Sequence, residues 1–316
     1  MQIVWTLLLV LPILVEGWLF KPKYHTVTIT GKFTCGGVPI RNCLVRLVDD
    51  DVLFDDTMKS GWTNSNGEFT LTGKGRDAFD TKPDPFAKIE YNYINRMRVK
   101  DRLGRTRWNR SSKKKNFSGI YNVGTVNINN EHCRAYLHFR SAIIHYLAQS
   151  GNGALPYSSL SVRSNALLTA GTPWATRNSV RLPGGYSLDY DTAKHELAHT
   201  VRQTLDGSFG HFLYDVIRFK YAQTHSCNKF TNFGFAFNEG WAEYWEGQCS
   251  CVTSGGSDMR YEGNVAACLC KLAACKGHTR MWNVVESYPK QIHSYSSFKS
   301  RLYAKYPGVC PGISPC

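Results

Sequence analysis

The sequence predicts two domains, an all-β sandwich followed by a mainly helical α+β domain. Between His25 and Asn130, short segments rich in β-branched residues alternate with turn residues, which is typical of strands. Beyond Asn130, apolar residues recur at steps of three and four, which indicates helices. The chain has 316 residues, of which 42% are hydrophobic and 20% charged, so it is long and apolar enough to bury a core in each domain.

The first 17 residues have the layout of a secretory signal peptide. An apolar run from Ile3 to Val15 precedes Gly17, after which we expect cleavage, so the first domain covers residues 18–130. This run is too short to cross a bilayer and no later stretch is long enough, so no membrane span is expected. We therefore expect a secreted, extracellular protein.

The cysteines favour secretion and predict a C-terminal region held together by disulfides. The chain has 11 cysteines, and such a number is usually paired in an oxidising compartment. Because 11 is odd, at least one cysteine stays outside the disulfides. Eight cysteines follow residue 220, and their Cys-X-Cys spacing favours disulfides over a cysteine metal cluster, with the connectivity left open.

Five segments of the first domain are expected to be strands, because each is apolar or alternating and rich in β-branched or aromatic residues. Turns such as Gly36-Gly37 and Asn64-Ser-Asn-Gly67 separate them. The expected strands are Thr26–Thr30, Leu44–Val48, Glu68–Thr72, Ala87–Tyr93 and Gly119–Ile128. With the shorter segments between them, about seven or eight strands are expected in a hundred residues, which favours a sandwich.

A basic segment from Arg96 to Lys115 carries ten basic residues and one acid, Asp101, and so holds most of the chain's net charge of +14. We interpret it as a solvated basic loop, and the glycosylation sequons at Asn109 and Asn116 fit an exposed position. The alternative is contact with an acidic surface or polyanion. No nucleic-acid or nucleotide-phosphate motif is apparent, so no nucleic acid partner is expected.

Several motifs of the first domain resemble the nematode-type transthyretin-like family. They are Thr28-Ile-Thr-Gly31, Cys35-Gly-Gly-Val-Pro39, Val45-Arg-Leu47, Asp55-Asp56, Thr63-Asn-Ser-Asn-Gly-Glu-Phe69 and Pro85-Phe-Ala-Lys-Ile89. The resemblance covers about residues 26–129 and implies a two-sheet, transthyretin-like sandwich. It also implies a secreted binding module, because members of the family are secreted and some are thought to bind or bridge extracellular partners. No catalytic motif comes with it.

The second domain, residues 131–316, contains the motif His195-Glu196-Leu-Ala-His199. Cys133–Gln149 is expected to be its first helix. The motif lies on another expected helix, capped by Asp189 or Asp191 and ended near Gly207, with a buried stripe at Ala193, Leu197, Val201 and Leu205. One turn apart, both imidazoles face the same way and can bind one zinc ion, with Glu196 beside the metal-bound water.

A catalytic zinc needs a third protein ligand, and the best candidate is Glu239. The extended motif with a third histidine is excluded, because Arg202 and Leu205 occupy the required positions. Asp206 and Asp215 lack a supporting motif. Around Glu239, aromatic residues at helical spacing bury one face and leave three glutamates, Glu239, Glu243 and Glu246, on another. Like charges so close together favour a cation nearby.

Together the two motifs resemble the gluzincin class of zincin metallopeptidases over about residues 131–250. The resemblance implies Zn²⁺ held by His195, His199 and Glu239, with Glu243 accepting a hydrogen bond from a ligating histidine. A connecting helix is expected at about residues 211–223.

The expected function is that of a secreted zinc metallopeptidase with Glu196 as general base and a peptide or protein as substrate. The donor that stabilises the oxyanion stays open among five candidates, which are Tyr244, Tyr261, His211, His225 and Arg202. Ser179–Leu182 is a candidate edge strand for holding an extended peptide. The alternative is a non-catalytic extracellular binding protein with a structural or inactive zinc site, although a purely structural site needs no general base.

Overall fold

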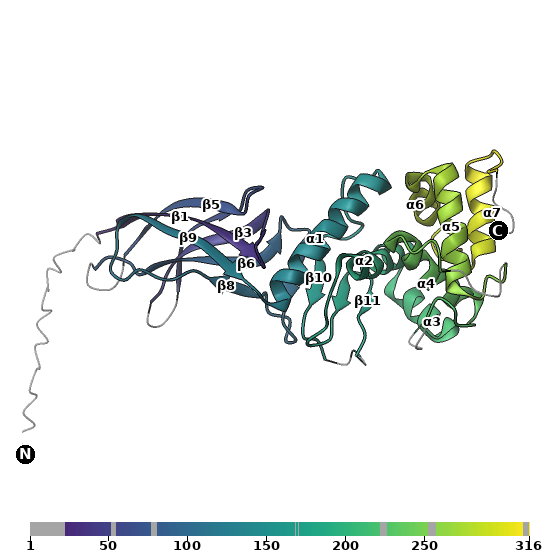
Figure 1. The fold of residues 1–316 in the computed structure, drawn as a ribbon, viewed down its shortest axis with the longest axis horizontal. Helices are drawn as coiled ribbons and strands as arrows, with labels where there is room; N and C mark the ends of the chain where they lie inside the picture. The colour runs from purple at the N-terminus through teal and green to yellow at the C-terminus, as the bar shows by residue number, and fades with distance from the viewer. Residues whose placement is uncertain are drawn as a thin grey trace, which may run out of the picture.

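The computed structural model describes residues 23–51, 55–76, 81–167, 169, 171–221, 226–251, 257–311 and 316. The expected signal peptide, residues 1–17, lies outside the described residues. The molecule is elongated, with the β-rich region at one end, the helices α3–α7 at the other, and α1 between them (Figure 1).

Strands dominate the first half of the chain and helices the second. The strands before the first helix are β1 (His25–Cys35), β2 (Val38–Pro39), β3 (Cys43–Asp49), β4 (Asp56–Trp62), β5 (Glu68–Gly75), β6 (Pro85–Tyr93), β7 (Met97–Lys100), β8 (Trp108–Arg110) and β9 (Gly119–Ile128). After α1 (Glu131–Ser150) come β10 (Leu160–Arg163), β11 (Trp174–Thr176) and β12 (Ser179–Arg181). The remaining helices are α2 (Tyr190–Leu205), α3 (Phe209–Phe219), α4 (Phe233–Glu246), α5 (Glu262–Lys276), α6 (His278–Ser287) and α7 (Tyr295–Lys305).

Two sheets form the N-terminal region, and all five expected strands are confirmed. In one sheet, β1 lies between β5, to which it is antiparallel, and β9, to which it is parallel. In the other, β3 lies between β4 and β6. Phe33 and Phe69 stack with ring centroids 5.2 Å apart. Together with Val45 and Ile89 they belong to the buried core, so the region is a β-rich sandwich.

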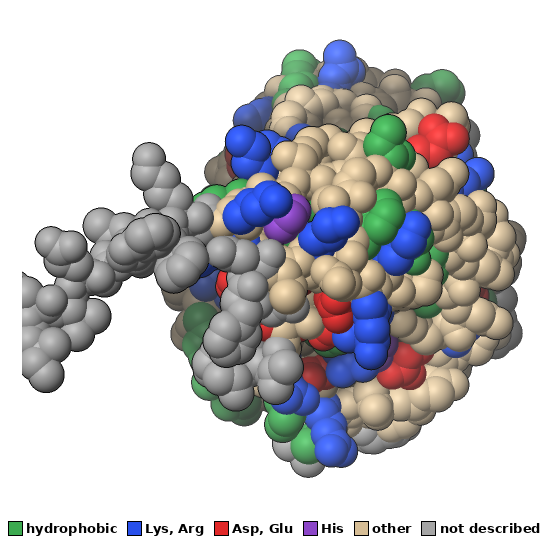
Figure 2. Space-filling view, turned by 90° about the vertical axis from the view of Figure 1, so that its left-hand side faces the viewer, with side chains coloured by type: hydrophobic (Ala, Val, Ile, Leu, Met, Phe, Trp, Pro, Cys, Tyr) green, Lys and Arg blue, Asp and Glu red, His purple; other side chains and the backbone are tan. Residues whose placement is uncertain are grey.

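The expected basic loop is wrong in part, because the strands β7 and β8 lie within it. Met97 and Val99 are fully buried while Arg98 points outward, which is the alternation of a strand with one buried face. Ion pairs also neutralise part of the charge, since Asp101 contacts Arg105 at 2.9 Å. On the sandwich end of the molecule, Lys and Arg side chains are scattered over the visible face rather than gathered in one patch (Figure 2).

The second sheet continues past Asn130, so the two halves of the chain share it. Strand β10 pairs in parallel with β7, and β12 and β11 follow in the order β7-β10-β12-β11. The first helix begins next to the expected boundary at Asn130, but the sheet crosses this boundary. Ser179–Leu182 is not an edge strand, because β12 lies between β10 and β11. Among the described strands, β11 forms that edge of the sheet.

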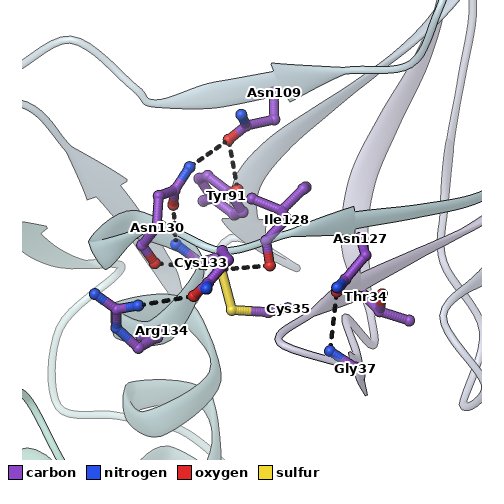
Figure 3. The surroundings of a disulfide bond; sticks show 11 residues. Thr34, Cys35, Gly37, Tyr91, Asn109, Asn127, Ile128, Asn130, Cys133 and Arg134 are labelled. Atoms are coloured by element: carbon purple, nitrogen blue, oxygen red, sulfur yellow. Dashed lines mark hydrogen bonds between the residues drawn. A yellow bond between two sulfur atoms is a disulfide. The ribbon is translucent and has the colours of Figure 1, made fainter.

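A disulfide between Cys35 and Cys133 joins the sandwich to α1 (Figure 3). Beside it, the Asn130 side chain caps α1 by accepting a hydrogen bond from the backbone N–H of Cys133 at 2.9 Å. The Asn130 amide also donates to Asn109 Oδ1, which accepts from the Tyr91 hydroxyl at 2.7 Å as well. Asn109 is therefore half-buried, in contrast to the exposed position expected for its sequon.

Four further disulfides hold the C-terminal helical region, as the cysteine pattern predicts. They are Cys227–Cys251, Cys249–Cys270, Cys268–Cys316 and Cys275–Cys310. Cys43 is the unpaired cysteine expected from the odd number, and burial raises the pKa of its thiol to about 12. No helix among the described residues is both long and apolar enough to cross a lipid bilayer.

Candidate metal centre

Helix α2 presents the two histidines of the motif. The Asp189 side chain caps its start by accepting a hydrogen bond from the backbone N–H of Thr192 at 2.7 Å, which selects one of the two expected caps. Ala193, Leu197 and Val201 are fully buried, so this helix is fixed along the expected apolar stripe. Its orientation places both imidazoles toward α4.

Helix α4 supplies the third candidate ligand. It begins after Asn232, whose side chain caps it, and ends at Gly247 in the left-handed conformation. Gly240 allows close packing on α5, because a Cβ there would lie 2.7 Å from the Glu262 carbonyl oxygen. This packing holds the preceding residue, Glu239, in a buried position facing α2.

The structure brings the three predicted ligand atoms together. His195 Nε2 lies 3.1 Å from His199 Nε2 and 3.4 Å from Glu239 Oε2. His199 Nε2 lies 3.0 Å from the same Glu239 oxygen. Donor atoms held about 2.0–2.2 Å from one tetrahedral ion lie about 3.3–3.6 Å from one another, so this set is close to the spacing that zinc requires. The side chains of His199 and Glu239 are 8% and 6% exposed, against 16% for His195, so the site opens toward His195.

A different glutamate from the one expected orients His195. The Glu246 carboxylate contacts His195 Nδ1 at 2.9 Å, and this contact favours the tautomer with the proton on Nδ1 and the lone pair on Nε2, the atom that faces His199. The expected acceptor, Glu243, is not brought to either histidine by a hydrogen bond. One of its oxygens, Oε2, is buried with no hydrogen-bond partner. Burial, and next the nearby Glu262, raise the pKa of Glu243 to about 8.

Helical geometry explains why Glu246 takes this position. Seven residues are almost two turns, so Glu246 lies about 20° around the helix from Glu239, whereas Glu243 lies about 40° away in the other direction, toward α5. Burial opposes a charge on His195, but hydrogen bonds to Glu239 and Glu246 outweigh it and raise the pKa of the imidazole well above its ordinary value. Both carboxylates thus favour a positive charge at this position, which either a proton or a bound metal ion can supply.

Asn238 and Arg202 hold the third ligand from behind. The Asn238 amide donates to Glu239 Oε1 at 2.8 Å, and Arg202 Nη1 donates to Asn238 Oδ1 at 2.7 Å. Arg202 is 3% exposed and also donates to the Ile292 carbonyl, so its guanidinium is committed to positioning. The sequence analysis did not assign a role to Asn238. Its position directly before Glu239, on a helix expected to be buried, is the feature that could have indicated this role.

The oxyanion candidates have other partners. The Tyr244 hydroxyl bonds to His278 Nδ1 at 2.6 Å, and the Tyr261 ring packs on Phe230. His211 belongs to a separate cluster with two aspartates, and Arg202 supports Asn238. His225 lies outside the described residues. The role of oxyanion donor therefore stays unassigned.

Comparison with known proteins identifies the N-terminal region. Residues 30–100 match the transthyretin-like family TTR-52. Transthyretin-like protein 5 of Caenorhabditis elegans is 35% identical over 69 residues, which are 21% of this chain and 50% of that protein. The chain therefore spans half the length of this curated relative. The N-terminal region of the chain is a transthyretin-like domain, and the region that follows it is helical.

Solved structures give only weak likenesses. A 9R-lipoxygenase from Cyanothece PCC8801 is 16% identical with a TM-score of 0.24, covering 61% of this chain and 24% of that chain. The major plantain pollen allergen Pla l 1 is 14% identical with a TM-score of 0.21, covering 34% of this chain and 94% of that chain. Likenesses of this strength carry no argument about fold or function.

Proposed function

We propose that the protein is a secreted zinc-dependent peptidase in which a transthyretin-like domain precedes the catalytic region. The observation that carries the proposal is the convergence of His195 Nε2, His199 Nε2 and a Glu239 oxygen within 3.4 Å of one another. Two neutral imidazoles and one carboxylate form a donor set typical of catalytic zinc, which takes three protein ligands and leaves one position for water. The disulfides favour secretion, because such bonds persist in oxidising compartments.

The residues around these ligands suit peptide hydrolysis. When bound, Zn²⁺ lowers the pKa of a water ligand toward about 7 and polarises a carbonyl group. Glu196 follows His195 directly and is 6% exposed, so its carboxylate acts in a water-poor environment. In the proposed reaction Glu196 accepts a proton from the attacking water and passes it to the leaving amine. Glu246 keeps His195 in the ligating tautomer during both steps.

The edge of the mixed sheet offers a place for an extended substrate. Strand β11 is antiparallel to β12, and its other side carries no strand among the described residues. Trp174 on this strand is 36% exposed. A peptide that adds to this edge gains main-chain hydrogen bonds with little demand on its side chains, as in other cases of strand addition. This assignment replaces Ser179–Leu182 as the peptide-holding segment.

Peptide cleavage by the zinc-loaded protein, beside the same protein with Glu196→Gln, tests the proposal. Gln keeps the size of the side chain but cannot accept the proton, so cleavage is expected to fall by at least about a hundredfold while zinc content stays unchanged. Equal cleavage by both proteins would remove the peptidase and leave the alternative, an extracellular binding protein with a structural zinc site. The matched control is Glu68→Gln, an exposed glutamate of the sandwich, which leaves cleavage unchanged.

A further inference from the structure

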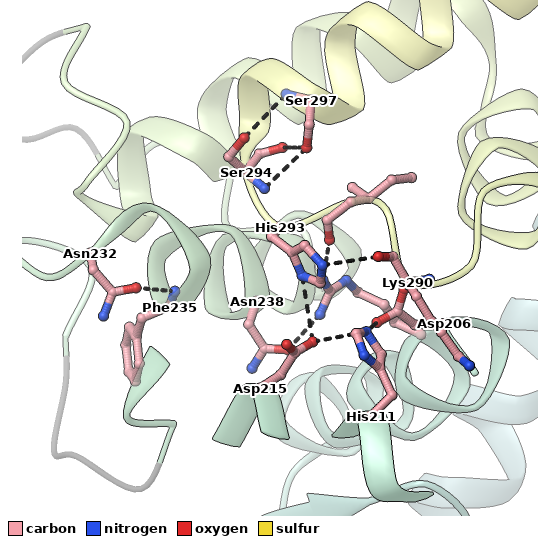
Figure 4. Close-up of polar contacts among 12 residues, drawn as sticks. Asp206, His211, Asp215, Asn232, Phe235, Asn238, Lys290, His293, Ser294 and Ser297 are labelled. Carbon is pink, nitrogen blue, oxygen red and sulfur yellow. Dashed lines mark hydrogen bonds and ion pairs between the residues drawn. The ribbon is translucent and has the colours of Figure 1, made fainter. Parts of the chain in front are cut away.

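A second cluster of histidines and aspartates lies beyond the end of α2, with the aspartates buried and the histidines half-buried (Figure 4). His211 Nε2 lies 3.2 Å from Asp206 Oδ2 and 3.3 Å from Asp215 Oδ2. His293 Nδ1 lies 3.5 Å from the same Asp215 oxygen. These residues come from three places, namely the C-cap of α2, the first turns of α3 and the segment before α7.

The cluster presents lone pairs to one point. His293 Nε2 is 3.1 Å from the Lys290 carbonyl oxygen, which can only accept, so Nε2 carries a proton and, in the neutral imidazole, Nδ1 presents a lone pair to Asp215. Asp206 is held in turn, because its Oδ1 accepts from the backbone N–H of Lys290 at 2.8 Å. A carboxylate oxygen and an imidazole lone pair that face each other repel unless a proton or a metal cation lies between them.

Hydrogen bonds inside the cluster do not account for this arrangement. His211 Nε2, His293 Nδ1 and Asp215 Oδ1 are buried and have no hydrogen-bond partner. Asp215 is 3% exposed, so water does not compensate for the missing bonds. The guanidinium nearby, that of Arg202, is occupied by Asn238 and the Ile292 carbonyl. The separations of 3.3 Å and 3.5 Å between Asp215 Oδ2 and the two histidine nitrogens match the edges of a tetrahedron around an ion with bonds of about 2.0–2.2 Å.

We propose that His211, Asp215 and His293 form a second metal site, which binds a zinc-class divalent ion, while Asp206 contacts His211 from outside the ligand set. Two imidazoles and one carboxylate suit zinc better than calcium or magnesium, which prefer oxygen ligands alone. Three protein ligands leave one position of a tetrahedral zinc ion for water. The ion would fasten α3 to the segment before α7.

Metal content after exhaustive dialysis tests this site separately from the peptidase site. The wild-type protein is expected to retain two equivalents of zinc by atomic absorption. His211→Ala and His293→Ala are each expected to retain one, and so is His199→Ala, which leaves the second cluster intact. The matched control is His138→Ala on α1, a histidine outside both clusters, which retains two.

The pattern of losses separates the two sites. If His199→Ala retains no zinc, or if His211→Ala retains as much as the wild type, the second site is wrong. If the wild type holds one equivalent that His211→Ala loses and His199→Ala keeps, the second site stands and the peptidase proposal falls. Should His211→Ala fail to fold, His199→Ala alone decides, because its remaining equivalent must come from the second cluster. The unfolding temperature of His199→Ala is then expected to drop when a chelator removes the remaining zinc.

Discussion

Removing the Glu246 carboxylate is expected to weaken zinc binding at the candidate metal centre without removing a ligand. Carboxylates that orient ligating histidines typically contribute about 10- to 100-fold in metal affinity, or about 1.4–2.7 kcal/mol. Glu246 contacts His195 Nδ1 at 2.9 Å, and its side chain is 18% exposed, so solvent screens it only in part. Gln keeps an acceptor but loses the charge, so we expect about a tenfold loss for Glu246→Gln. Glu246→Ala also loses the acceptor and is expected to lose about a hundredfold.

The measurement is a zinc competition titration against a chromophoric chelator, and the chain offers a matched control. Glu243 lies on the same helix but turns toward Glu262, so Glu243→Gln is expected to leave the affinity unchanged. A greater loss of zinc affinity in Glu243→Gln than in Glu246→Gln would refute this reasoning and return the orienting role to the residue that the sequence predicted.

Three further predictions concern the scaffold. Replacing Cys35 and Cys133 by Ala removes a disulfide that closes a loop with a sequence separation of 98 residues. The free energy of unfolding by denaturant is therefore expected to fall by about 4–5 kcal/mol. An unchanged midpoint of denaturant unfolding would contradict a covalent link between the two halves. A thiol reagent should detect no thiol in the native protein and one, Cys43, after unfolding, and a reading of three or more would show that the disulfides are wrong. Gly240→Ala forces a Cβ to within 2.7 Å of the α5 backbone and is expected to cost about 1–3 kcal/mol by thermal unfolding; an unchanged unfolding temperature would mean that α4 and α5 are less tightly packed.

The sequence predicted the elements whose signal is local. The five strands of the sandwich and the start of α1 follow from alternation, turns and apolar spacing, and all of them are present. The sequence does not predict strand β7, because the high charge of Arg96–Lys115 favours a loop. Met97 and Val99 nevertheless alternate with basic residues, as in any half-buried strand. Its partner β10 follows a helix of 20 residues, and such long-range pairing leaves no local trace.

The candidate metal centre shows the same limit. His195 and His199 are fixed by one helical turn, and Glu239 follows from an acidic face on an apolar helix. To predict that Glu246 rather than Glu243 contacts His195, one must know where α5 lies, because Glu243 points toward α5. The spacing of residues in the sequence does not contain this information. The second cluster is equally hidden from the sequence, because Asp215 lies in no metal-binding motif and His293 lies far along the chain.

Anomalous diffraction at the zinc edge, from crystals of the zinc-loaded protein, tests the central claim most directly. A peak is expected about 2.0–2.2 Å from His195 Nε2, His199 Nε2 and a carboxylate oxygen of Glu239. A map with no peak among these three atoms, from protein that retains zinc in solution, would contradict the claim.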